Sequence, residues 1–206
     1  MKIKNSHKIL KILLKERLST ITSLAQEIKL SRVGTWKILK NLEQERMIIL
    51  SSIGAGETSI YTVHLNWENP LQKKMLALIL TEDALMYQRW ITNFKDLENK
   101  VDFTILYGSI LHSLNQANDI DIINVISSDN KNKFLEIEDT LKKIQKTLMK
   151  EIHAQNLTKK ELEEELKKSN KAFVDAIKKG VVLFGQEKFI DFMESEHEKR
   201  NSRMLP

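Results

Sequence analysis

The chain has 206 residues, enough for one large domain or two small ones. Hydrophobic residues make up 41% and charged residues 30%, a balance typical of globular rather than disordered proteins. The absence of cysteine excludes disulfides and thiolate metal sites and favours a reducing, cytoplasmic location. The lysine-interrupted beginning lacks a signal-peptide pattern, and the longest apolar run, Met75–Leu80, is too short to span a bilayer, so we expect no membrane partner.

The excess positive charge lies at one end of the chain. The net charge is +5, and residues 1–70 hold eleven Lys or Arg against six Asp or Glu, whereas residues 71–206 hold twenty-two of each. A polyanion would therefore be attracted to the first third of the chain. A solvated basic surface is the alternative interpretation, and charge alone does not separate the two.

Three helices are predicted in this basic region. Ser6 is expected to cap the first, Thr20 or Thr22 to open the second, and Ser31 to cap a third that ends near Arg46. Apolar residues recur along all three at helical spacing, so each helix has a face to bury against the others.

Two β-like segments, 47–52 and 59–65, follow the helices and are separated by the flexible Gly54-Ala55-Gly56. Three helices and then a hairpin is the order of a winged helix-turn-helix. Residues 21–50 resemble winged-helix transcriptional regulators, and the resemblance covers about the first sixty-five residues. Double-stranded DNA is therefore the expected partner, and a three-helix fold used for protein contacts is the alternative.

If the third helix enters the major groove, its outward residues are those that the core does not need. Arg32 is predicted to read a guanine edge, whereas Lys37 and Lys40 are predicted to contact phosphates. Trp36 packs against a base or sugar, under the wing, or in a dimer contact, and these alternatives stay open. The predicted DNA-binding residues are Ser31, Arg32, Trp36, Lys37 and Lys40.

Residues 70–98 are expected to form a helical connector. Pro70 marks its start, and the pattern that follows predicts one long helix or two joined near Thr81. Its heavy apolar face either covers the second domain or pairs with a second copy of the chain, so a homodimer is an expected partner state.

The segment 101–126 has residues suited to metal and phosphate chemistry. Gly108-Ser109 turns a predicted strand into a short helix, and its N–H groups and hydroxyl suit a nucleotide phosphate. Asp119 and Asp121 alternate along a second strand and therefore share one face, where a cation would relieve their repulsion. This pair suits metal-assisted nucleotidyl transfer. An exposed strand face with alternating acids is the alternative interpretation.

Leu106-Tyr107-Gly108-Ser109 followed by Asp119-Ile120-Asp121 resembles the signature of the DNA polymerase β-type nucleotidyltransferase superfamily, in particular its minimal members, and residues 177–189 are similar to the end of such domains. The resemblance implies a small mixed-sheet α/β domain, Mg²⁺ and a nucleoside triphosphate such as ATP. It also implies that Gly108 and Ser109 contact phosphate, and that Asp119 and Asp121 ligate metal and are catalytic.

The chain departs from that family's pattern in two places. His112 and Ser113 stand where an arginine and a glycine are common. The strand expected over 151–155 carries His153, with Glu151 on the same face, in place of the family's third carboxylate. Losing this general base would lower the rate by roughly a hundredfold or more, so we expect weak catalysis or nucleotide binding alone.

The rest of the second domain is expected to be supporting helices. Apolar residues recur at helical spacing over 134–149, and Thr158 with Glu161 forms a capping box that opens a helix ending at Gly180. No other segment resembles a hydrolase triad, a Walker loop or a zinc cluster.

The sequence therefore predicts an α+β protein with four parts: a winged helix-turn-helix (1–69), a helical connector (70–98), a small mixed-sheet α/β nucleotidyltransferase-like domain (99–193) and a charged tail (194–206). The primary hypothesis is a DNA-binding regulator whose second domain binds NTP-Mg²⁺ and transfers a nucleotidyl group to a protein or small molecule. The alternatives are a non-catalytic regulator whose second domain senses nucleotide or mediates dimerisation, and an antitoxin-like protein that acts on a partner toxin.

Overall fold

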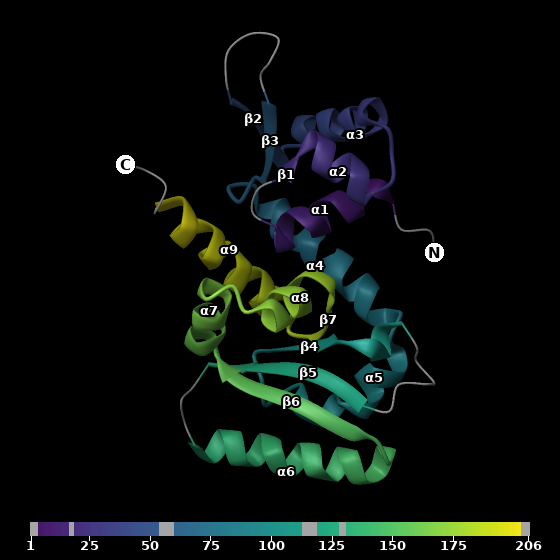
Figure 1. Ribbon diagram of the computed structural model, residues 1–206, viewed down its shortest axis with the longest axis vertical. Helices are drawn as coiled ribbons and strands as arrows, with labels where there is room; N and C mark the ends of the chain where they lie inside the picture. The colour runs from purple at the N-terminus through teal and green to yellow at the C-terminus, as the bar shows by residue number, and fades with distance from the viewer. Residues whose placement is uncertain (1–3, 17–18, 54–59, 113–118, 128–130, 203–206) are drawn as a thin grey trace. The chain divides into compact units, whose positions relative to one another are not determined.

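Figure 1 shows the computed structural model, which describes residues 4–16, 19–53, 60–112, 119–127 and 131–202. These residues form a mixed α+β protein, as the sequence predicts. Within them, no helix is both long and apolar enough to cross a membrane.

The chain divides into two compact units, residues 1–79 with 193–206 (unit 1) and residues 80–192 (unit 2). Both boundaries fall inside helices, α4 (Pro70–Leu85) and α9 (Gln186–Ser202). The division into functional parts at residues 69, 98 and 193 stays a prediction.

Unit 1 contains helices followed by a small antiparallel sheet. The helices are α1 (Asn5–Lys15), α2 (Ile21–Glu27) and α3 (Arg32–Gln44). The strands, in sheet order, are β1 (Ser19–Thr20), β3 (Ile60–Leu65) and β2 (Ile48–Ile53). The β2–β3 hairpin is the predicted wing, whereas β1 was not expected. The predicted loop glycines 54 and 56 lie outside the described residues.

Two of the three expected helix caps in unit 1 are confirmed. Thr20 accepts a hydrogen bond from the backbone N–H of Ser23, and Ser31 accepts one from that of Gly34. The expectation for Ser6 is wrong, because α1 begins one residue earlier, at Asn5, and no side chain caps it. A cap contributes about 1 kcal/mol, which is less than the burial of one leucine, so the apolar face of α1 decides where it lies. That face consists of the buried residues Ile9, Leu10, Leu13 and Leu14.

The helical expectations for residues 70–98 and 194–202 need correction. α4 runs without a break through Thr81, and the chain instead turns at Met86–Tyr87 before α5 (Gln88–Asn93) and a short 3-10 turn, η2 (Lys95–Leu97). Residues 194–202, the start of the predicted charged tail, continue α9.

Unit 2 is built on a four-stranded mixed sheet. Its strands, in sheet order, are β6 (Glu151–Thr158), β5 (Asp119–Ile126), β4 (Phe103–Tyr107) and β7 (Val181–Phe184). β5 and β6 are parallel, and the other pairs are antiparallel. The other elements besides α5 and η2 are η3 (Ser109–Leu111), α6 (Lys131–Leu148), α7 (Lys159–Lys167), α8 (Lys171–Lys179) and the first turns of α9.

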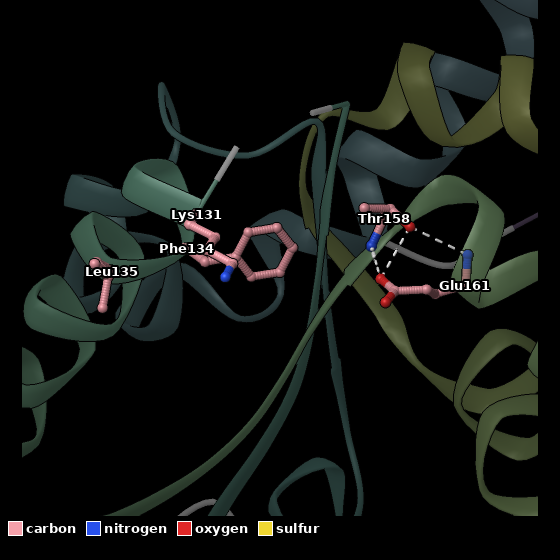
Figure 2. Close-up of a pocket in the computed structure, with 5 residues that line it drawn as sticks. All are labelled: Lys131, Phe134, Leu135, Thr158 and Glu161. Carbon is pink, nitrogen blue, oxygen red and sulfur yellow. Dashed lines mark hydrogen bonds between the residues drawn. The ribbon is translucent and has the colours of Figure 1, made fainter. Parts of the chain in front are cut away.

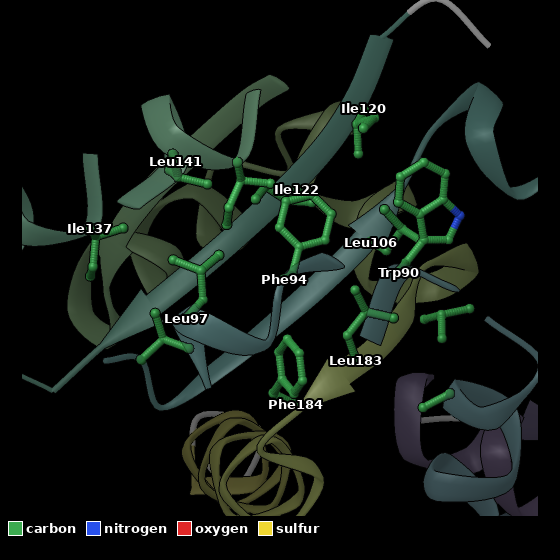
Figure 3. Close-up of a cluster of buried hydrophobic side chains, with 14 of the residues drawn as sticks. Trp90, Phe94, Leu97, Leu106, Ile120, Ile122, Ile137, Leu141, Leu183 and Phe184 are labelled. Carbon is green, nitrogen blue, oxygen red and sulfur yellow. The ribbon is translucent and has the colours of Figure 1, made fainter. Parts of the chain in front are cut away.

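Helices cover both faces of this sheet. On one face, Ile120 and Ile122 of β5 belong to a buried cluster (Figure 3). The helical residues in this cluster include Trp90 in α5, Phe94 at the C-terminal end of α5, and Ile137 in α6. On the other face, the ring of Phe103 lies edge-on to Phe189, with 5.4 Å between centroids, and 5.7 Å from Phe192. Alternation along each strand therefore assigns successive residues to two different cores.

The segment expected as one helix from Thr158 to Gly180 is two helices. Its capping box is confirmed: Thr158 and Glu161 exchange hydrogen bonds through their side chains and backbone N–H groups (Figure 2). α7 then ends at Lys167, Ser169 takes a positive φ of 55°, and the Asn170 side chain caps α8. Ser and Asn favour turns and caps over helix interiors, which explains the break.

A buried chain of polar side chains links three strands. The Thr104 hydroxyl donates to Asn124 Oδ1 (2.8 Å), and the Asn124 amide donates to Asn156 Oδ1 (2.9 Å). Thr104 and Asn124 are fully buried. The three residues lie opposite one another on β4, β5 and β6, so these bonds hold the strands in one register.

The buried Asp102 carboxylate ties four segments of unit 2 together. It accepts hydrogen bonds from Lys188 Nζ (2.8 Å) and Ser127 Oγ and lies 3.1 Å from Lys159 Nζ. Burial by itself would raise the pKa of Asp102, but the bonds from Lys188, Ser127 and Lys159 outweigh it and lower the pKa to about 2. Because this value lies below the ordinary 3.8, the ionised carboxylate stabilises the fold above about pH 4.

We predict that Asp102→Asn lowers the free energy of unfolding of unit 2 by roughly 2 kcal/mol at pH 7, the equivalent of this pKa shift. The difference from wild type should shrink by about half at pH 3, because below the ordinary pKa of 3.8 the carboxylate of the unfolded chain takes up a proton while the native carboxylate stays largely ionised. Urea denaturation can be followed by Trp90 fluorescence in a Trp36→Phe/Trp67→Phe background. Asp139→Asn, at an exposed surface carboxylate, is the matched control; an equal effect there would contradict the prediction.

Candidate functional site

The outward face of α3 carries the predicted DNA-binding residues of unit 1. Arg32 and Lys37 are exposed, and Ser31 lies at the start of the helix with its hydroxyl engaged in the cap. Lys40 Nζ pairs with Glu43 at 2.7 Å, so a phosphate would have to compete with this carboxylate. Arg32 and Lys37 are therefore the stronger candidates for DNA contacts.

Trp36 packs against the wing. Its ring lies 5.2 Å from that of Tyr61 on β3, and Lys40 Nζ lies 4.8 Å from the Trp36 ring centre. Of the three alternatives left open by the sequence, this geometry favours packing with the wing. The contact fixes the position of α3 relative to the hairpin.

Val33 is a candidate contact that sequence reasoning missed. It is 68% exposed on the same face of α3 as Trp36 and Lys37. Apolar side chains on such helices contact thymine methyl groups. The sequence did contain a sign of this, because Val33 is apolar but does not belong to the set of residues that α3 packs against the core of unit 1.

In unit 2, three side chains from two parallel strands converge at one end of the sheet. Asp121 lies opposite His153 in the pairing of β5 with β6, and Asp119 lies opposite Glu151. His153 Nδ1 is 3.6 Å from Asp119 Oδ2 and 3.5 Å from Asp121 Oδ1. One ligand atom from each of these three residues lies within 4.8 Å of the others, so the set could hold a metal ion. The predicted side-by-side placement of Asp119 and Asp121 is thus present.

The Gly108-Ser109 turn lies against the two carboxylates. Ser109 Oγ donates to Asp119 Oδ1 at 3.5 Å, and a Cβ atom at Gly108 would lie 2.1 Å from Asp121 Oδ2. Gly108 also has a φ of +82°, a region that favours glycine. The helix expected after this turn is, within the described residues, only the three-residue η3, so its dipole is small. Phosphate binding by Gly108 and Ser109 stays a prediction.

Mutual repulsion and partial burial set the electrostatics of this cluster. Burial, and then the charge of Asp119, raise the pKa of Asp121, whereas His153 opposes them. Desolvation acts to lower the pKa of His153, but the neighbouring carboxylates, Glu151 and then Asp121, raise it. Burial and the charge of Asp121 likewise raise the pKa of Tyr107, which lies opposite Asp121 on β4. A cation between the acids would relieve this repulsion.

Sequence reasoning placed His153 and Glu151 on the correct strand but did not predict that the His153 imidazole faces both aspartates. Only the register between two strands separated by α6 could reveal this contact, and local pattern does not contain that register. His112, at the other departure from the family pattern, is exposed.

A separate pocket lies near the start of α6 (Figure 2). The Phe134 ring points toward the strand that carries Thr158, and the Glu161 carboxylate is already bound by Thr158. Among its described lining residues, the pocket therefore offers no free acid for chemistry. These residues are Lys131, Phe134, Leu135, Thr158 and Glu161.

We predict that the His153 imidazole titrates above its ordinary pKa of 6.5, because Glu151 and Asp121 favour its charged form. Glu151→Gln should lower this pKa, whereas Glu138→Gln on the exposed side of α6 should leave it unchanged. An NMR titration of the histidine ring protons measures the pKa of His153 in the wild type and in the two variants. A His153 pKa that does not respond to Glu151→Gln would show that the two side chains do not interact in solution.

Comparison with known proteins supports a function for unit 1. Residues 4–49 match the family described as winged helix-turn-helix DNA-binding. No curated protein matches the chain.

Solved structures with detectable likeness include variants of the Lactococcus lactis protein ZitR. One is 22% identical and covers 48% of this chain and 64% of that chain, less than two thirds of its length, with a TM-score of 0.31. A second is 19% identical over 70% and 81% of the two chains, with a TM-score of 0.31, and a third is 16% identical over 72% and 77%, with a TM-score of 0.32. These TM-scores are too low to identify a shared fold.

The family match covers α1, α2 and α3 and reaches the start of β2. The helices and the wing that follows have the element order predicted from the sequence. Residues 4–49 are therefore the core of a winged helix-turn-helix DNA-binding domain.

Proposed function

We propose that the protein is a transcriptional regulator that binds duplex DNA through unit 1 and responds to a ligand bound by unit 2. The observation that carries this proposal is the exposed face of α3, with Arg32, Val33 and Lys37, on a domain that matches a DNA-binding family. The localisation of the excess positive charge in residues 1–70 supports it. A homodimer and a cytoplasmic location stay part of the proposal.

Each residue on this face has a distinct expected role. Arg32, in the first turn of α3, suits bidentate contact with a guanine edge, and Val33 suits a thymine methyl group. Lys37 suits a phosphate. The Ser31 hydroxyl is occupied by its cap, so Ser31 positions the helix, and Trp36 braces it against the wing.

The ligand response is assigned to the cluster of Asp119, Asp121 and His153. Their side chains are 40%, 24% and 48% exposed, so a ligand can reach them from solvent. In the adjacent turn, the Ser109 hydroxyl donates to Asp119, and Gly108 lies against the Asp121 carboxylate. An open cluster of this kind suits binding of a charged ligand.

For DNA binding, we predict that Lys37→Ala makes the negative slope of log K against log salt shallower by about 0.9, the value for one phosphate contact on B-DNA. Arg32→Ala should reduce discrimination among sequences selected from a randomised duplex pool, by about 1–3 kcal/mol at the base it contacts. Fluorescence anisotropy at several salt concentrations measures both effects.

Lys146→Ala is the matched control for these variants, because it removes one exposed charge from α6 in unit 2. It should leave slope and discrimination at their wild-type values. If Arg32→Ala and Lys37→Ala also left both quantities unchanged, α3 would not be the DNA-reading helix.

A second candidate function is nucleotidyl transfer with Mg²⁺ and a nucleoside triphosphate to a small molecule, a protein acceptor or a toxin partner. The observation that favours it is the placement of Asp119 and Asp121 beside the Gly108-Ser109 turn. The residues do not fit the three-carboxylate Mg²⁺ site that this reaction implies, because an imidazole, His153, stands at the third position. We therefore derive no catalytic step for this site.

We predict that wild-type protein incubated with α-labelled nucleoside triphosphates and Mg²⁺ gives no more labelled product than Asp119→Asn/Asp121→Asn, because the third carboxylate is missing. His153→Asp restores a carboxylate at that position and is the matched gain-of-function variant. Label transfer by the wild type that is lost in the double variant would establish the second candidate in place of the sensor proposal.

A further inference from the structure

We propose that Asp119, Asp121 and His153 bind one divalent transition-metal cation of the Zn²⁺ class, in preference to Mg²⁺. The inference deepens the proposed ligand response of unit 2 and names the class of ligand. It does not depend on DNA binding by unit 1. Its evidence is the donor chemistry of the cluster, the spacing of the donor atoms and the contacts behind them.

The donor set contains one nitrogen and two carboxylates. Mg²⁺ prefers oxygen ligands and retains several waters, whereas imidazole is a common ligand of Zn²⁺ and other transition metals. His153 Nδ1 faces both aspartates, so the nitrogen points toward the position that a cation would occupy.

The two distances from His153 Nδ1 to the aspartate oxygens are compatible with a tetrahedral centre. With metal–ligand bonds of about 2.1 Å, two donors on a tetrahedral ion lie roughly 3.4 Å apart, against roughly 3.0 Å for neighbours on an octahedral ion. The Nδ1–oxygen distances here are 3.6 Å and 3.5 Å.

Each of the three donors is supported on its far side. Asp119 turns Oδ2 toward the imidazole while Oδ1 contacts Ser109, and Asp121 turns Oδ1 toward it while Oδ2 lies against Gly108. The other ring nitrogen of the imidazole, His153 Nε2, is 3.4 Å from Glu151 Oε1. A ligating imidazole usually donates its other ring N–H to a carboxylate, a backbone carbonyl or a water, and a carboxylate in this place orients the ring and increases its basicity.

Three protein ligands leave a fourth tetrahedral position free. Zinc sites that act on ligands keep such an open position, whereas structural sites fill all four. The side chains of His153 and Asp119 are 48% and 40% exposed, so solvent reaches the cluster. A water or an anionic group of a small molecule can therefore complete the coordination.

Isothermal titration of the full chain, without DNA and in a non-coordinating buffer, tests the inference with ZnCl₂ and MgCl₂. We expect one Zn²⁺ per chain, bound at least roughly a hundredfold more tightly than Mg²⁺. On Zn²⁺ binding, the ¹⁵N shift of His153 Nδ1 should change to that of a metal-bound nitrogen in the wild-type protein, which removes any dependence on variants that fold poorly.

The variants separate the roles of the residues. His153→Asp should weaken Zn²⁺ binding and narrow the preference over Mg²⁺, and Glu151→Gln should weaken Zn²⁺ binding by about 10- to 100-fold. His64→Asn, in unit 1, is the matched control and should change neither affinity. Equal affinity for Zn²⁺ and Mg²⁺, or a His153 ring shift that does not respond to Zn²⁺, would overturn the inference. The effect of Zn²⁺ on DNA affinity is measured separately, by fluorescence anisotropy. If Zn²⁺ binds but DNA affinity does not change, the ligand response is rejected and the metal site stands.

Discussion

The parallel pairing of β5 with β6 is the constraint on which the candidate site depends. It sets Asp121 opposite His153, and a slip of one residue would turn the imidazole to the opposite face, toward α6. The buried bonds from Thr104 to Asn124 and from Asn124 to Asn156 oppose such a slip, because it would leave polar groups unpaired in an apolar core. A polar ladder on one face of the sheet thus fixes an exposed cluster on the other.

Features encoded in short stretches of sequence were predicted well. Thr20, Ser31 and Thr158 cap their helices because a cap needs only neighbours in the chain, and the alternation of Asp119 and Asp121 follows from strand geometry alone. The placement of the His153 imidazole beside the two aspartates could not be predicted in this way. It depends on a register between strands that α6 separates, and many registers are compatible with the same local pattern.

The errors in the helix limits also arise from tertiary contacts, because burial of apolar side chains decides where these helices begin and end. Ser6 is a good cap in isolation, yet the burial of the α1 apolar face extends the helix past it. The turn at Met86–Tyr87 allows Trp90 to enter the core, where it is fully buried. Burial of large side chains outweighs local preference in both places.

The contact of Trp36 with Tyr61 also depends on tertiary structure, and the sequence offered packing against the wing only as one of three alternatives.

The contact between Gly108 and Asp121 makes the residue allowed at one of these positions depend on the residue at the other, although they lie thirteen residues apart in the sequence. Any side chain at position 108 would occupy the space of the Asp121 carboxylate, in addition to the strain of a positive φ. Loss of the acid therefore leaves position 108 unhindered by that carboxylate, whereas a side chain at position 108 would first have to displace the Asp121 carboxylate from its place beside the turn. Among divergent copies of the gene, the two positions should covary, and the glycine should outlast the acid.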